Sequence, residues 1–130
     1  LGMQVLARSS EEGVQPGLGW IDAKVVRFNF AGLDTGNRRL TIPHMGWNSL
    51  TVKTPDRLFA DMEPQAMFYF VHSYHFCCDH PQDSWANSFY GYEFTAVAGR
   101  ENIIGAQFHP EKSLRFGKQL LTNFCNGGIQ

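Results

Sequence analysis

The feature that most limits the fold is an almost unbroken apolar run at residues 66–73, "AMFYFVHS". A strand with one face in water alternates apolar and polar residues, and this run shows no such alternation. Continuous apolar runs of this length are typical of strands covered on both faces, as in α/β sheets. The sequence therefore predicts an α/β fold with a strand over these residues.

Apolar and turn residues place the other elements around this strand. Further strands are expected at residues 19–30, 90–98 and 101–109, and a short strand at 38–43 ends at Pro43, before a loop. The helical spacing of Leu, Met and Val predicts a first helix over residues 1–13. A last helix is expected over residues 113–128, with Ser113 as its N-cap. Its apolar side is expected to hold Leu114, Gly117, Leu120, Leu121 and Phe124.

Length and charge limit the class of protein. The 130 residues are enough for one domain, and the formal net charge of −1 with scattered basic residues argues against a nucleic-acid binder. No apolar stretch approaches the roughly 20 residues that span a bilayer. The three cysteines, two of them adjacent, make a poor disulfide framework and favour a cytoplasmic location. Because Leu1 is not a methionine, the natural chain is expected to begin further upstream.

The stretch "IIGAQFHPEKS", residues 103–113, carries the strongest chemical pattern. Proline pushes the residue before it toward extended backbone, so His109 and Glu111 are expected to point to the same side. A carboxylate beside an imidazole fixes its tautomer and raises its basicity, as in catalytic triads. The alternative is structural: His109 ends a strand, and Glu111 lies in the first turn of a helix, where the dipole favours a negative charge.

Four segments in order carry a resemblance to a known family. "QFHPE" after an apolar strand resembles the His and Glu signature of class I glutamine amidotransferases, and "LGMQ" at residues 1–4 resembles the segment directly after their nucleophile. "IPHMGWN" at residues 42–48 and "FYFVHSY" at residues 68–74 are similar to the glutaminase subunits of imidazole glycerol phosphate synthases. The resemblance implies a flavodoxin-like α/β sandwich with a central mixed sheet. Residues 1–130 would be the C-terminal portion of a single domain whose first strands are missing.

The resemblance also implies roles for particular residues. His109 would be the general base and acid, oriented by Glu111. The backbone N–H of Leu1, the side chain of Gln4 and the backbone of Ser73 and Tyr74 would hold glutamine. Met45, Gly46, Trp47 and Asn48 would face a synthase (cyclase) subunit in a heterodimer that receives the ammonia. No cofactor and no metal are expected.

The nucleophile expected from the resemblance is a cysteine immediately before Leu1. None of Cys77, Cys78 and Cys125 lies at an expected strand-to-helix elbow, so we expect this chain alone to be inactive. A zinc site in "HSYHFCCDH", residues 72–80, is disfavoured because adjacent cysteines do not easily chelate one tetrahedral ion. Two functional alternatives remain: a related subunit that supplies ammonia for amidination of a surface-polysaccharide sugar, and an inactive domain that binds a partner.

Overall fold

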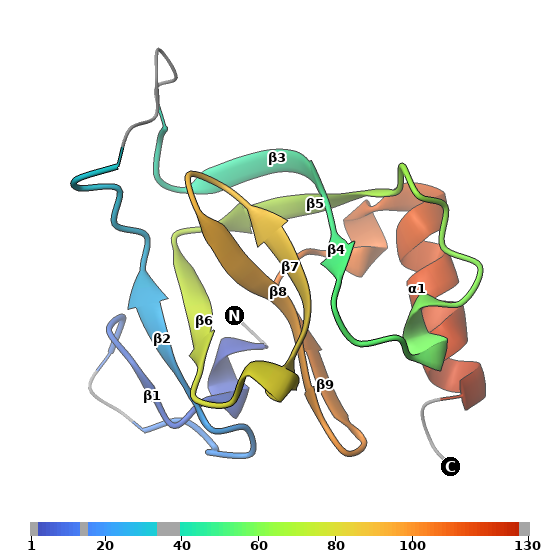
Figure 1. The fold of residues 1–130 in the computed structure, drawn as a ribbon, viewed down its shortest axis with the longest axis horizontal. Helices are drawn as coiled ribbons and strands as arrows, with labels where there is room; N and C mark the ends of the chain where they lie inside the picture. Colours follow the sequence, from blue (N-terminus) through green and yellow to red (C-terminus); the bar gives the residue numbers. More distant parts are fainter. Residues whose placement is uncertain (1–2, 14–15, 34–39, 128–130) are drawn as a thin grey trace.

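The computed structural model describes residues 3–13, 16–33 and 40–127 (Figure 1). The strands are β1 Ser9–Ser10, β2 Ala23–Arg27, β3 His44–Ser49, β4 Thr51–Val52, β5 Met67–His72, β6 Tyr74–Cys78, β7 Ser84–Phe89, β8 Glu93–Arg100 and β9 Ile103–Ala106. Short 3₁₀ turns are η1 Gln4–Leu6, η2 Arg57–Phe59, η3 Pro81–Asp83 and η4 Pro110–Lys112, and the helix is α1 Leu114–Gly127.

The central sheet is mixed and runs in the order β1-β2-β6-β8-β7-β4, with β9 also paired to β8. The β1–β2 pair is parallel, and the remaining pairs of this sheet are antiparallel. Strand β8 lies at its centre, and its residues 94–99 are buried on both faces. The α/β class with a mixed central sheet is thus confirmed.

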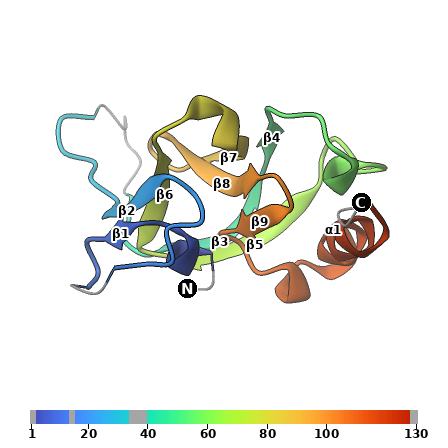
Figure 2. The same cartoon turned by 90° about the horizontal axis from the view of Figure 1, so that it is seen from below.

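Strands β3 and β5 form a separate antiparallel ribbon that leads toward α1 (Figures 1 and 2). The strand expected at residues 66–73 is therefore confirmed as β5, but only one of its faces is fully covered. Phe68, Phe70 and His72 point into the core, whereas Tyr69 and Val71 keep partial exposure. Strand β8, not β5, is the strand buried on both sides.

The core consists of two adjoining apolar clusters. The larger one joins the inner faces of β5 and β8 to α1 through residues that include Phe68, Phe94 and Leu120. The smaller one lies under β2 and β6 and includes Ile21 and Phe76. These two clusters bury the residues from which the sheet gains most of its hydrophobic stabilisation.

The helix expected at the N-terminus is wrong. Residues 3–13 form the single turn η1, followed by strand β1 alongside β2. The Arg8 N–H donates to the Ala23 carbonyl, and the Glu11 N–H donates to the Val25 carbonyl. Pairing with β2 therefore outweighs the helical spacing of a few apolar residues.

The loop expected after Pro43 is also wrong, because β3 begins at His44. On β3 the usual pattern is inverted: the side chains of Met45 and Trp47 are exposed, while the polar residues His44 and Asn48 point inward. Strand prediction from the sequence assumes that the apolar residues face the core, so this segment does not look like a strand.

The last helix is confirmed, but its buried side differs from the expected one. Leu120 and Gly117 are buried and Phe124 is half-buried, whereas Leu114 and Leu121 are exposed at 74% and 46%. Phe116, which was not expected on this side, packs against Phe68. The helix is rotated so that Phe116, and not Leu114, packs against the core.

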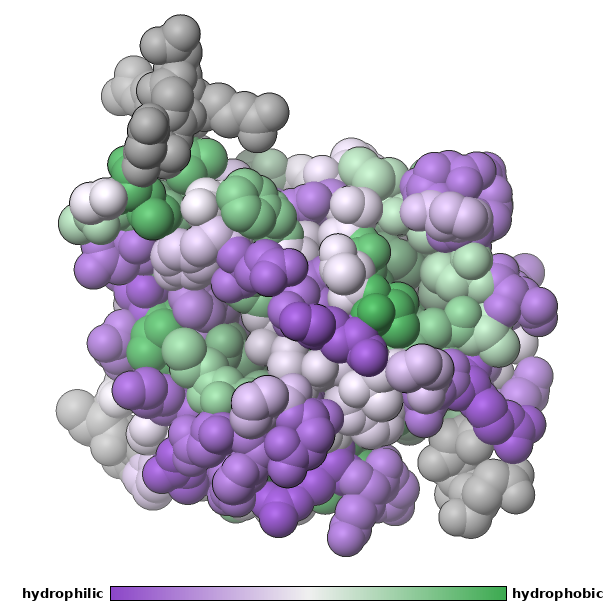
Figure 3. Space-filling view, in the orientation of Figure 1, coloured by the Kyte–Doolittle hydropathy of each residue, from purple (hydrophilic) through white to green (hydrophobic). Residues whose placement is uncertain are grey.

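The surface is polar around small apolar patches. On the face in Figure 3, apolar side chains lie in several separate groups between polar ones.

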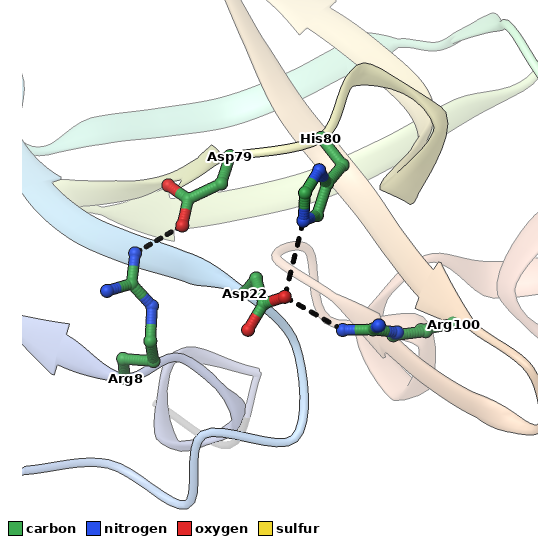
Figure 4. A network of polar contacts seen from close by, with 5 residues as sticks. All are labelled: Arg8, Asp22, Asp79, His80 and Arg100. Carbon is green, nitrogen blue, oxygen red and sulfur yellow. Dashed lines mark hydrogen bonds and ion pairs between the residues drawn. The ribbon is translucent and has the colours of Figure 1, made fainter.

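A group of ion pairs lies at one end of the sheet. Asp22 binds Arg100 at 3.0 Å and His80 at 3.3 Å, and Arg8 pairs with Asp79 (Figure 4). The hydrogen bond from Arg100 is the main cause of a lowered Asp22 pKa. No helix within the described ranges is long and apolar enough to cross a bilayer.

Candidate functional site

His109 and Glu111 are in direct contact. Strand β9 leads through Gln107 and Phe108 to His109, whose backbone is extended, with φ −100° and ψ 99°. Pro110 then starts η4, and this turn brings the Glu111 carboxylate back, so that its Oε1 lies 2.9 Å from His109 Nδ1. The expected same-side placement of the two side chains is thus present.

The electrostatics of this pair favour an ionised carboxylate. A hydrogen bond from its own backbone N–H, followed by the hydrogen bond with His109, lowers the pKa of Glu111 below its usual value. A carboxylate beside Nδ1 accepts a hydrogen bond from the N–H of that nitrogen, which leaves Nε2 as the atom that can exchange a proton. The His109 side chain is 35% exposed, so the imidazole is partly open to solvent.

The backbone of His109 is held to strand β5. The His109 N–H donates to the Tyr69 carbonyl at 2.9 Å, and the Ser113 hydroxyl donates to the His109 carbonyl at 2.6 Å. The Tyr69 N–H donates in turn to Ser113 Oγ at 3.0 Å. Ser113 lies where the N-cap of α1 was expected, but its hydroxyl binds β5 and His109 rather than the first turn of the helix.

A polar cavity of about 220 Å³ lies beside His109. It is lined by Gln4, Glu12, Arg27, Val71, His72, Ser73, Tyr74, Gln107 and His109. The structure thus brings three of the expected binding residues, Gln4, Ser73 and Tyr74, together with the histidine. Glu111 contacts the histidine without lining the cavity, and Leu1 lies outside the described residues.

Gln4 is fixed from both sides. Its Nε2 donates to the Tyr74 carbonyl and to Gln107 Oε1, each at 3.2 Å. Gln107, which is only 6% exposed, was not singled out in the sequence. Its position two residues before His109, at the end of an apolar strand, was the signal that could have found it.

Two charged residues of the cavity were also missed. Glu12 and Arg27 both line it, although they come from a turn after β1 and from the end of β2. Because they are far apart in the sequence, the sequence alone did not indicate that they share a cavity. A carboxylate and a guanidinium in one cavity complement the ammonium and carboxylate groups of an amino acid.

The expected partner residues Met45, Gly46, Trp47 and Asn48 lie on β3 but divide between its two faces. Met45 and Trp47 point outward and are 63% and 44% exposed. Trp47 packs edge-on against Tyr69, with ring centroids 5.7 Å apart. Asn48 lies on the other face and donates to the Phe89 carbonyl at 2.8 Å.

The three cysteines differ in exposure, and none of them lines the cavity beside His109. Cys77 and Cys78 lie in strand β6, and Cys125 is exposed on α1. Burial raises the pKa of the Cys78 thiol to about 11, so it is protonated and weakly nucleophilic at neutral pH.

Comparison with known proteins gives the class to which this fold and site belong. The family model "Glutamine amidotransferase class-I" matches residues 1–127. The chain therefore belongs to the class I glutamine amidotransferase family.

Within that class, the chain is similar to proteins named "Imidazole glycerol phosphate synthase subunit HisH". It is 48% identical to the one from Leptospira interrogans over 126 residues, which are 97% of this chain and 60% of the relative. It is 47% identical to the one from Bdellovibrio bacteriovorus, over 95% of this chain and 59% of the relative. A protein named "subunit HisH 2" from Pseudomonas aeruginosa is 45% identical over 95% of this chain. The chain thus spans about 60% of the length of these curated relatives.

Proposed function

We propose that this chain is part of a glutaminase subunit of imidazole glycerol phosphate synthase, in histidine biosynthesis in the cytoplasm. Residues 1–130 would be the C-terminal portion of a single glutamine amidotransferase domain. The observation that carries the proposal is the 2.9 Å contact between His109 and Glu111 at the edge of the cavity lined by Gln4, Ser73 and Tyr74. Membership of the class I family and the names of the relatives support it.

In this proposal the polar cavity holds glutamine. Gln4 and the backbone of Ser73 and Tyr74 bind it, and the backbone N–H of Leu1 contributes to the oxyanion hole. Glu12 offers a carboxylate for the substrate's ammonium group, and Arg27 offers a guanidinium for its carboxylate. The two charged side chains favour an amino acid over a simple amide.

His109 serves as base and acid around a cysteine nucleophile, expected immediately before Leu1. The thiolate adds to the side-chain carboxamide carbon, and the C–N bond breaks as the imidazolium gives its proton to the departing ammonia. Water then attacks the thioester carbon while His109 takes its proton, the C–S bond breaks to restore the cysteine thiolate, and glutamate leaves. Glu111 holds the imidazole in the required tautomer throughout.

The ammonia passes to a cyclase subunit that docks in a heterodimer on the β3 face. The exposed side chains of Met45 and Trp47 support this placement, and Trp47 packs against Tyr69, whose carbonyl accepts from the His109 N–H. Gly46 and Asn48 belong to the same strand, β3. No cofactor and no metal are needed for this chemistry.

The test compares the chain alone with the full-length protein. Because the triad acts as a unit, we expect no glutamine hydrolysis from residues 1–130 and measurable ammonia release once the preceding residues are present. In the full-length protein His109→Asn should lower kcat by about 10²–10⁴, the usual contribution of a general acid–base.

His80→Asn is the matched control, since His80 is a half-exposed histidine bound to Asp22 at the other end of the sheet. Steady ammonia release from residues 1–130, or unchanged kcat in His109→Asn, would overturn the proposal. A pull-down that captures a sugar-amidating enzyme in place of the cyclase would support the related polysaccharide subunit instead.

A further inference from the structure

Three histidines are buried together between the β3–β5 ribbon and the central sheet. His44, His72 and His75 have exposed fractions of 4%, 6% and 5%. Aromatic rings surround them: the Phe28 ring lies 5.1 Å from that of His72 and 4.9 Å from that of His75, between ring centroids. Because burial in apolar surroundings disfavours the charged form, the pKa values of His44 and His72 are lowered to about 4.

For His44 and His72, the donor and the acceptor of each hydrogen bond can be assigned. His72 Nδ1 lies 2.8 Å from the Tyr74 carbonyl, which can only accept, so Nδ1 carries the proton. In a neutral ring the Nε2 of His72 is then an acceptor, and His44 Nδ1, at 2.9 Å, must donate to it. His44 Nε2 is left as an acceptor, and the Asn48 amide faces it in a longer contact of 3.4 Å.

This chain of hydrogen bonds ends at the cavity. The Tyr74 carbonyl accepts from His72 and also from Gln4 Nε2, and Gln4 Nε2 donates as well to Gln107. Both hydrogens of the Gln4 amide are therefore committed, and the amide cannot exchange its oxygen and nitrogen without losing both bonds. The orientation of Gln4 depends on the Tyr74 carbonyl, whose direction His72 helps to hold.

We infer that His44 and His72 are positioning residues, which hold the Tyr74 carbonyl and, through it, the Gln4 amide in the orientation that receives the substrate. The inference rests on the proposed function only in taking glutamine as the molecule that fills the cavity. Neither histidine exchanges protons with the substrate. His75 has the same degree of burial but binds the Tyr92 hydroxyl and the Phe76 carbonyl, so it is not part of the chain.

The first experiment measures the kinetic constants of the full-length protein for glutamine. His72→Leu removes the donor to Tyr74 and should raise KM about tenfold or more, with kcat changed less than threefold. His72→Asn places an amide N–H near the position of Nδ1 and should restore most of the affinity. His75→Leu is the matched control, because it removes an equally buried imidazole and should leave KM unchanged.

The second experiment needs neither substrate nor activity. In the ligand-free protein, ¹⁵N-edited NMR of the imidazoles should show His44 and His72 neutral at pH 7, both with the proton on Nδ1. A proton on Nε2 of His72, or an unchanged KM in His72→Leu, overturns the inference. If the full-length protein shows no glutaminase activity but NMR finds both Nδ1 tautomers, the proposed function fails while the hydrogen-bond chain stands.

Discussion

At the scale of single residues, Ser113 joins the two halves of the site. Its side chain has no exposed surface, and its hydroxyl accepts from the Tyr69 N–H while donating to the His109 carbonyl. One oxygen thus connects β5 to the residue that precedes η4. A fully buried hydroxyl with both roles filled cannot be removed without leaving polar groups unpaired.

We therefore expect Ser113→Ala to lower the free energy of unfolding by about 1–3 kcal/mol, the usual cost of unpaired buried polar groups. Urea denaturation followed by fluorescence measures this change. Ser9→Ala, at an exposed position on β1, is the control and should stay within about 0.5 kcal/mol of the parent. Equal effects of Ser113→Ala and Ser9→Ala on the free energy of unfolding would contradict the role given to the Ser113 hydroxyl.

Single residues also show how much of the site the sequence can reveal. The contact between His109 and Glu111 follows from local rules, because Pro110 constrains the backbone between them. Glu12 and Arg27 escaped notice because only the folded chain brings them to one cavity, whereas Gln107 was overlooked although it lies two residues before His109. Gln4, Ser73 and Tyr74 were found through the resemblance, not through local physics.

At the scale of elements, α1 approaches the turn η4 very closely. A Cβ atom on Gly117 would lie 1.9 Å from the Pro110 carbonyl oxygen, so only glycine permits this packing. The helix therefore lies directly against the turn that carries Glu111. The position of the catalytic pair proposed here depends on that contact.

Gly117→Ala should destabilise the protein by about 1–3 kcal/mol, the range for overpacking, although alanine is the better helix former by about 1 kcal/mol. In the full-length protein it should also reduce the glutaminase activity proposed above, because the added Cβ would displace the turn η4, which carries Glu111. The two effects are read from thermal unfolding and an ammonia assay. Gly13→Ala is the control, since a Cβ there meets no atom of the described residues within 4 Å. A stabilised Gly117→Ala protein would refute the packing argument.

The elements differ in how well the sequence predicts them. β5, β8 and α1 were predicted because long apolar runs and helical spacing carry their own signal. β3 was missed because its apolar side chains face outward, and the N-terminal segment because its pairing with β2 is a tertiary effect. β6 and β7, which flank β8 in the sheet, were not expected as strands either, so a central position does not by itself make a strand visible in the sequence.

At the scale of the whole molecule, buried neutral histidines make stability depend on pH. The pKa values of His44 and His72 fall from the ordinary 6.5 to about 4 in the folded state, and that of His75 is also lowered. Between these values the unfolded chain binds more protons than the folded one. The free energy of unfolding therefore decreases as the pH falls from 6.5 toward 4.

We expect a loss of up to about 1.4 kcal/mol per pH unit for each histidine in this window, with little change from pH 7 to 8. Urea midpoints measured from pH 8 to 4.5 give the profile. Replacing His72 with leucine should reduce the slope of this profile by the contribution of one proton. A flat profile between pH 6.5 and 5 would show that the imidazoles are not desolvated.

Tyr69 joins the outer surface of the ribbon to the interior of the site. Its ring packs on Trp47 outside, and its carbonyl receives the His109 N–H inside. A molecule resting on Trp47 is therefore separated from the imidazole by one amino acid. A displacement of Trp47 would therefore act on the backbone of His109 by way of one ring contact and one hydrogen bond.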